Sequence, residues 1–181
     1  TSKLRASPHL CDPPGMHDVV LEYFTGEKYA GLLVALVGLL AMIVAVFLFQ
    51  PRHELRPFAV VLALMGLLEL VVGVGLWMKT GPQVDTLLAL HSSDPARMLA
   101  DEGARMTRVQ ATFVRLEIVW LALIAISAVI ALTQRGRPVL WCASLGFFLH
   151  ASFLFVFDSI AERRGAVYLH ALTRGPASSA P

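Results

Sequence analysis

Two polar side chains stand inside long apolar stretches of this sequence and could carry chemistry there. Glu69 interrupts the apolar segment 58–78, and His150 interrupts the apolar segment 139–157. Each follows, by twelve residues, a proline that ends a short polar loop. If both segments cross a bilayer, this equal spacing predicts that the carboxyl group and the imidazole lie at the same depth.

A carboxyl group at this depth needs a special environment. A central charge in a membrane helix costs about 2.5–3.5 kcal/mol on the insertion scale. Glu69 must therefore face other helices, be protonated or have a partner, and the spacing predicts His150 as that partner. Two interpretations of this candidate intramembrane polar pair stay open. One is a neutral hydrogen bond that sets helix register, and the other is a proton-accepting pair that lines a pathway.

Three further charged residues are expected at the membrane interface. Arg115 and Glu117 lie at the mouth of the third apolar segment, two residues apart, so they do not face each other on a helix. We expect each of them to pair with another element. Asp158 directly follows the fourth apolar segment and is expected to lead its helix back into water.

No pattern in the sequence indicates an enzyme. The two cysteines are far apart, and neither a nucleophile–base set nor a known spacing of metal ligands is present. We therefore expect no catalytic residue, no cofactor and no metal. A net charge of +2 without a long basic run also argues against binding to nucleic acid.

The elements that must position these residues are four long apolar segments. Hydrophobic residues make up 56% of the 181 residues and charged residues only 15%, against about 25% in soluble domains. Segments of about 20 apolar residues are long enough to cross roughly 30 Å of hydrocarbon. The predicted spans are residues 29–49, 58–78, 112–132 and 139–157. The fold class is therefore an all-α membrane protein with four transmembrane helices in a bundle.

The spans form two hairpins around the short loops 50–57 and 134–138. Both hairpins enter the membrane from the same side and have similar loop sequences, which suggests a parallel repeat about an axis along the membrane normal. The four-span domain is expected to cover residues 16–172. A disordered leader, 1–15, would precede it, and a disordered tail, 173–181, would follow.

The third helix is expected to extend into solvent. Asp94-Pro95 is typical of a helix start, with the aspartate as N-cap and the proline in the first helical position. A helix from about residue 95 should run unbroken into the third span, supported by an Asp101–Arg105 ion pair. Its apolar stripe recurs at helical spacing: Leu99, Met106, Val109, Phe113, Leu116 and Trp120.

The other elements are expected to be shorter. Residues 17–24 suit a short interfacial helix, which Thr25-Gly26 would separate from the first span, with Thr25 as its N-cap. The second span should end near Trp77 and Lys79, followed by a polar connection. Beyond Asp158 the fourth helix should soon end, with at most one further turn at Tyr168–Leu172.

The expected partners are the lipid bilayer and either another membrane protein or further copies of this chain. The favoured function is a non-enzymatic integral membrane protein that acts through helix or protein partners, as an accessory subunit or a protective binding protein. The alternative is a proton-coupled transporter or channel component that uses Glu69 and His150. The expected location is a bacterial inner membrane, and the Lys/Arg distribution favours cytoplasmic termini.

Overall fold

The computed structural model describes residues 15–49 and 55–174. They form four long helices: α1 (Met16–Phe49), α2 (Arg56–Ser93), α3 (Pro95–Thr133) and α4 (Pro138–Arg174). All four are long and apolar enough to cross a membrane, which confirms the four expected spans by length and composition. The leader up to residue 14, the first loop and the tail beyond residue 174 lie outside the described residues.

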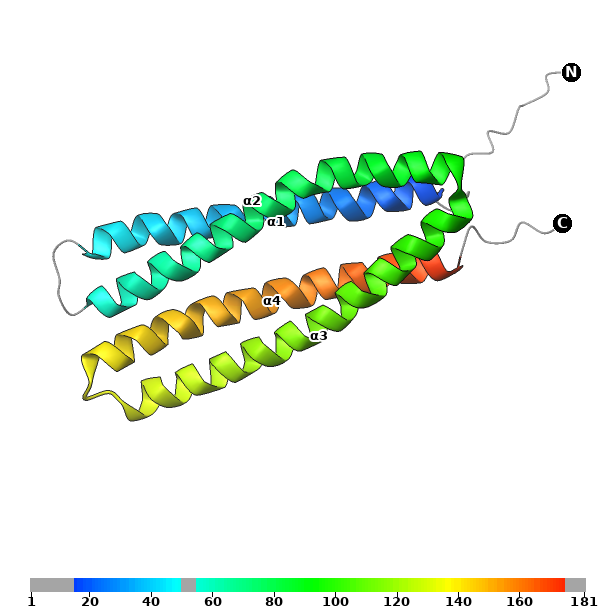
Figure 1. The fold of residues 1–181 in the computed structure, drawn as a ribbon. Helices are drawn as coiled ribbons and strands as arrows, with labels where there is room; N and C mark the ends of the chain where they lie inside the picture. Colours follow the sequence, from blue (N-terminus) through cyan, green and yellow to red (C-terminus); the bar gives the residue numbers. More distant parts are fainter. Residues whose placement is uncertain (1–14, 50–54, 175–181) are drawn as a thin grey trace, which may run out of the picture.

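The helices pack as two antiparallel hairpins, α1 with α2 and α3 with α4 (Figure 1). The second hairpin turn is tight, because the Arg137 amide donates to the Gln134 carbonyl oxygen at 2.9 Å. Helix α2 also packs against α4, whereas the backbones of α1 and α3 do not approach each other closely in the described ranges. The two hairpins are therefore joined mainly through α2 and α4.

All four helices, not only the third, continue beyond the expected spans. At about 1.5 Å per residue, helices of 34–39 residues are about 50–58 Å long, roughly 20 Å more than the hydrocarbon needs. The excess lies on the side of the chain termini. We call this part the headpiece, and it comprises residues 16–28, 79–93, 95–111 and 158–174.

Three expected helix boundaries are wrong for this reason. Helix α1 runs through Thr25-Gly26 without a break, so Thr25 is not an N-cap and residues 17–24 are not a separate interfacial helix. Helix α2 continues through Pro82 to Ser93, although this proline removes one backbone donor. Helix α4 reaches Arg174, so the first two residues assigned to the tail are helical.

The third helix begins as expected, but its predicted ion pair is wrong. The Arg97 amide donates to the Asp94 side chain at 3.0 Å, which confirms the aspartate as the N-cap of α3. The Asp101 carboxylate pairs with Arg97 at 3.5 Å instead of with Arg105. Arg105 pairs with Glu102 instead of with Asp101.

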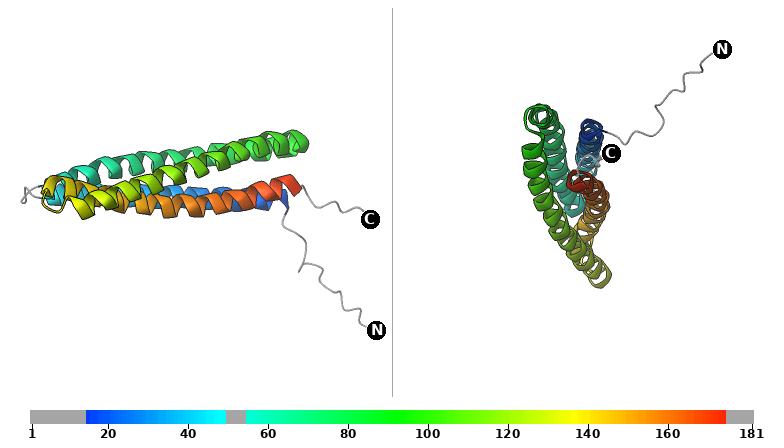
Figure 2. Two further views of the ribbon diagram at one scale, coloured as in Figure 1. Left: turned by 90° about the horizontal axis from the view of Figure 1, so that it is seen from below. Right: turned by 90° about the vertical axis from the view of Figure 1, so that its right-hand side faces the viewer.

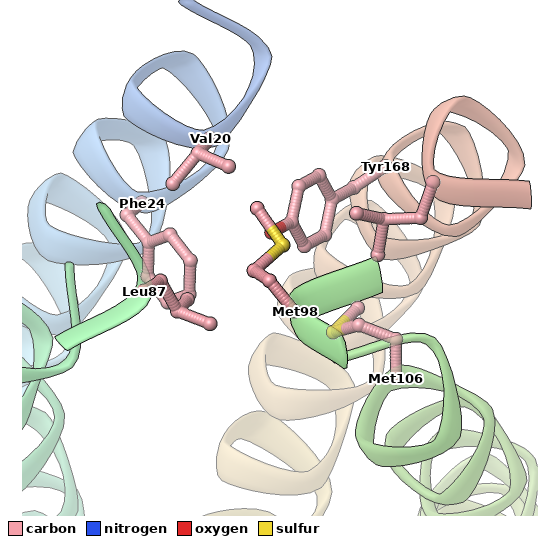
Figure 3. Packing of buried hydrophobic residues seen from close by; sticks show 7 residues of the cluster. Val20, Phe24, Leu87, Met98, Met106 and Tyr168 are labelled. Carbon is pink, nitrogen blue, oxygen red and sulfur yellow. The ribbon is translucent and has the colours of Figure 1, made fainter. Parts of the chain in front are cut away.

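A hydrophobic core from all four helices holds the headpiece together (Figure 3). Large side chains dominate it, because burial of apolar surface from water drives packing outside the bilayer. Its buried members are Val20, Phe24, Leu87, Met98, Met106, Tyr168 and Leu172.

The spans pack differently, because lipid offers no such driving force. Their buried positions are mostly small residues, which bring helix backbones together: Ala30, Gly31, Ala35, Gly38 and Ala45 on α1, and Gly66 and Gly73 on α2. Toward the loops the helices spread into a row in the order α1, α2, α4, α3, whereas in the headpiece they close into a square (Figures 1 and 2).

The topology can be tested by cysteine labelling. In a background without Cys11 and Cys142, cysteines at Ser92 and Arg135 should react with a membrane-impermeant reagent from opposite sides. The reason is that Ser92 lies in the last turn of α2 in the headpiece, whereas Arg135 lies in the second hairpin turn. Labelling of both positions from the same side of intact cells would contradict the four-span arrangement.

Candidate functional site: a buried glutamate–histidine pair

Helices α2 and α4 bring the two intramembrane polar side chains together. Close approach of these helices needs a small residue on α4, and Gly146 supplies it. A Cβ atom at Gly146 would lie 2.9 Å from Cγ1 of Val61 on α2, so a larger residue would force Val61 or the helices to shift. One turn further along α4, His150 faces Glu69 of α2.

The Glu69–His150 contact is short and closed to solvent and lipid. His150 Nδ1 lies 2.7 Å from Glu69 Oε1. The side chain of His150 is only 6% exposed and that of Glu69 only 1%. The depth match expected from the sequence thus corresponds to a direct hydrogen bond between the two hairpins.

Each partner keeps one buried atom without a hydrogen bond. Glu69 Oε2 and His150 Nε2 have no partner within the described part of the chain. The pair is electrically neutral either as a carboxylic acid with a neutral imidazole or as a carboxylate with an imidazolium. Neutrality lowers the cost of burial, since a lone charge in the bilayer is expensive. Chemically, the arrangement can lock two helices together or hold one transferable proton.

Two of the three expected interfacial charges join α3 to α4. Glu117 accepts a hydrogen bond from the Ser159 hydroxyl at 3.0 Å. Asp158 accepts one from the Trp120 indole N–H at 2.7 Å. The Glu117 contact is with another helix, as expected, whereas Asp158 was expected to face water and instead binds Trp120 of α3.

Arg115 behaves differently. It is exposed, and among residues 15–49 and 55–174 it makes no hydrogen bond or ion pair. It lies three residues inside the third expected span, about 4.5 Å below the interface. The expected intramolecular partner of Arg115 is therefore not found within the described chain.

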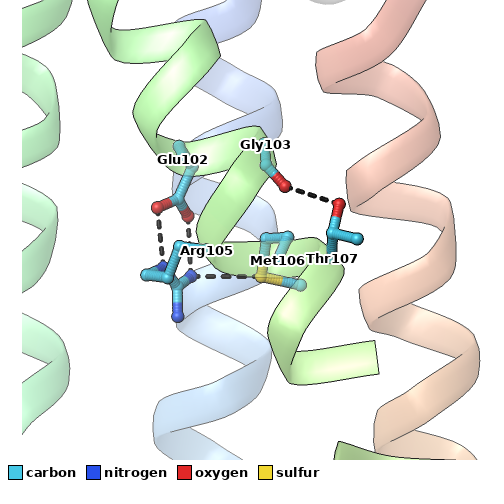
Figure 4. Close-up of polar contacts among 5 residues, drawn as sticks. All are labelled: Glu102, Gly103, Arg105, Met106 and Thr107. Atoms are coloured by element: carbon cyan, nitrogen blue, oxygen red, sulfur yellow. Dashed lines mark hydrogen bonds and ion pairs between the residues drawn. The ribbon is translucent and has the colours of Figure 1, made fainter. Parts of the chain in front are cut away.

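The sequence analysis missed a polar cluster in the headpiece. Glu102 is 2% exposed and binds Arg105 through two hydrogen bonds of 2.7 Å (Figure 4). The Arg105 guanidinium also lies over the Phe24 ring of α1, 5.8 Å from its centroid. A signal was present, because Met98, Glu102 and Met106 recur every four residues and so share one helix face.

Two stacked tyrosines continue this cluster toward α4. The rings of Tyr23 and Tyr168 are nearly parallel, with centroids 4.2 Å apart. Burial raises the pKa of Tyr23 to about 12. Burial also raises the pKa of Tyr168, and the nearby Glu102 carboxylate raises it further. Both phenols therefore stay neutral at physiological pH, and the stack adds no charge to the headpiece.

The fold and this site define a class of protein: a multi-pass, four-helix membrane protein with an ionisable pair between its hairpins. No group of three histidine, cysteine or acidic side chains in the described ranges is placed to hold a metal ion. Comparison of the chain with protein-family models, curated proteins and solved structures gives no match.

Proposed function

We propose that this is a non-enzymatic integral membrane protein that acts through a membrane-embedded partner, as an accessory subunit or a protective binding protein. The partner is another membrane protein or a second copy of the chain. We place it in a bacterial inner membrane with the headpiece in the cytoplasm. The headpiece carries most of the basic residues near the spans, which supports this orientation under the positive-inside rule.

The main support for this proposal is the exposed outer face of α3 in the third span. In the third span Ser127 is the only buried residue, and α3 packs mainly against α4 and only slightly against α2. The exposed side presents large apolar residues, namely Val114, Ile118, Val119, Leu121, Ile126, Val129 and Leu132. Lipid alone could cover this apolar surface.

Arg115 on the same side of α3 offers a charged contact to such a partner. From about 4.5 Å below the interface its long side chain can extend to the interface, where a cation is tolerated. The described chain offers Arg115 no acidic or carbonyl partner of its own. A neighbouring helix that supplies one would cover the apolar face and neutralise the charge together.

Site-specific photo-crosslinking in native membranes tests this proposal. A photoreactive residue at Ile118 or Ile126 of α3 should give a discrete protein adduct, and Arg115→Gln should reduce its yield. The same residue at Leu40, an equally exposed position on α1, should not give this adduct. Differently tagged copies show whether the adduct is a homodimer. No adduct from α3, or an equal adduct from α1, would contradict the proposal.

A second candidate is a proton-coupled transporter or channel component. The buried atoms Glu69 Oε2 and His150 Nε2, which lack partners within the described chain, favour it, because they are sites at which a proton can enter or leave the pair. Proton flux into liposomes containing the full chain separates the two functions. Flux that vanishes in Glu69→Gln, with folding intact, would support transport. No flux in the unmodified protein would retire this candidate.

A further inference from the structure

The headpiece contains a groove of about 660 Å³ between α1 and α4 that neither proposed function uses. The stacked rings of Tyr23 and Tyr168 line it together with apolar side chains. Its charged lining consists of Arg163, Arg164 and Glu22. Two cations and one anion give this lining a net charge of +1.

One of the two arginines in the groove is held in place but incompletely bonded. The Nε atom of Arg164 is buried and has no hydrogen-bond partner among the described residues. Its guanidinium lies against Gly26 of α1, where an added Cβ atom would come within 2.8 Å of Nη1. Gly26 therefore makes room for the guanidinium, and because Arg164 lines the groove, this group can meet an anion from outside the chain there.

The arginine end of the groove lies at the height of lipid headgroups. Gly26 precedes the first expected span by three residues, and Arg163 follows the fourth by six. At about 1.5 Å per residue these positions are about 5–9 Å beyond the hydrocarbon edge, which is the headgroup layer. Lys28 lies nearer the hydrocarbon edge, with its ammonium nitrogen 5.5 Å from the centroid of the Trp77 ring.

The space below the groove can receive acyl chains. Helices α1 and α4 lie side by side in the headpiece, but α2 comes between them toward the loops (Figures 1 and 2). By helical spacing, Tyr29 and Leu33 continue the groove side of α1 from Gly26, and Val156 and Ile160 continue that of α4 from Arg163; all four side chains are large and exposed. We call this space between α1 and α4, on the loop side of the groove, the α1–α4 fork. It is open and apolar where a lipid tail would lie.

We infer that the α1–α4 groove binds the phosphodiester of an anionic phospholipid, such as phosphatidylglycerol. The guanidinium groups of Arg163 and Arg164 donate to the phosphate oxygens, since arginine matches phosphate geometry well. The net charge of +1 in the groove complements a lipid of charge −1. The polar headgroup lies beside the tyrosine stack, and the tails enter the α1–α4 fork.

The test uses the full chain, purified in detergent and delipidated. Its thermal unfolding is followed as phosphatidylglycerol or phosphatidylcholine is added to the micelles. Phosphatidylglycerol should stabilise the protein at lower concentration than phosphatidylcholine. The double variant Arg163→Gln/Arg164→Gln should raise the half-maximal concentration by about tenfold or more, because charged hydrogen bonds are lost. The matched variant Arg135→Gln/Arg137→Gln, at the opposite interface, should leave it within about twofold.

A second variant and a competitor make every outcome decisive. Gly26→Ala keeps all charges but displaces the Arg164 guanidinium, and it should weaken phosphatidylglycerol binding even if the double variant does not fold. Equal stabilisation by the two lipids, or unchanged binding by both groove variants, would overturn the inference. Competition by millimolar glycerol 3-phosphate would show that the site takes a soluble phosphate and would overturn the lipid assignment.

Discussion

Glu69→Leu is expected to destabilise the folded protein by about 1–3 kcal/mol, the cost of a buried polar group that loses its partner. The substitution removes the Glu69 carboxylate, which lies 2.7 Å from His150 Nδ1. Hydrogen bonds between membrane helices average only about 0.6 kcal/mol. The larger cost of about 1–3 kcal/mol applies here. His150 Nε2 already lacks a partner among the described residues, so without Glu69 neither ring nitrogen would have a hydrogen bond.

A double-mutant cycle separates the pair from its surroundings. Glu69→Leu/His150→Leu should recover most of the lost stability, since apolar replacement of a buried pair is often neutral or stabilising. The measurement is the unfolding midpoint in detergent, which shifts by about 2–4 °C per kcal/mol for a chain of this size. Simple additivity of the two single variants would show that the side chains do not interact energetically.

Gly73→Ala is expected to destabilise the α1–α2 hairpin by about 1–3 kcal/mol, the usual cost of overpacking. A Cβ atom at Gly73 of α2 would come within 3.0 Å of the Ala35 backbone nitrogen and the Gly31 carbonyl oxygen of α1. These are backbone atoms, so the collision can be relieved only by moving one helix away from the other. Separation of the helices would then loosen the small-residue contacts along both spans.

Gly75 provides the matched control, two residues further along the same helix. A Cβ atom there meets nothing within 4 Å. Gly75→Ala should therefore be neutral or slightly stabilising, because alanine favours helix more than glycine does. Unfolding midpoints and disulfide crosslinking between cysteines placed on α1 and α2 report the difference. Equal behaviour of the two variants would show that the close approach at Gly73 does not hold the hairpin together.

The sequence by itself determined the four spans and the depth of the polar pair. A run of about 20 apolar residues must become a helix in lipid, because every backbone polar group has to be satisfied internally. The equal spacing of Glu69 and His150 from their loops then sets a common depth. Asp94 as the N-cap of α3 was also predictable, since capping depends only on neighbouring residues.

Tertiary structure decided how far the helices run and which faces meet. Thr25-Gly26 and Pro82 resemble helix ends locally, but packing in the headpiece core keeps α1 and α2 helical through them. By spacing alone, Arg105 could pair with Asp101, four residues earlier, or with Glu102, three residues earlier. The headpiece core selects Glu102, because Met98 and Met106 bury that face of α3.

The contact between Glu69 and His150 also needed the fold. Equal depth does not set the rotation of α2 and α4 about their axes, and only their packing across Gly146 turns the two side chains toward each other. The α1–α4 groove depends in the same way on two segments more than 130 positions apart in the sequence. Local patterns determine elements and depth, whereas the facing of distant helices follows from the steric fit of their surfaces.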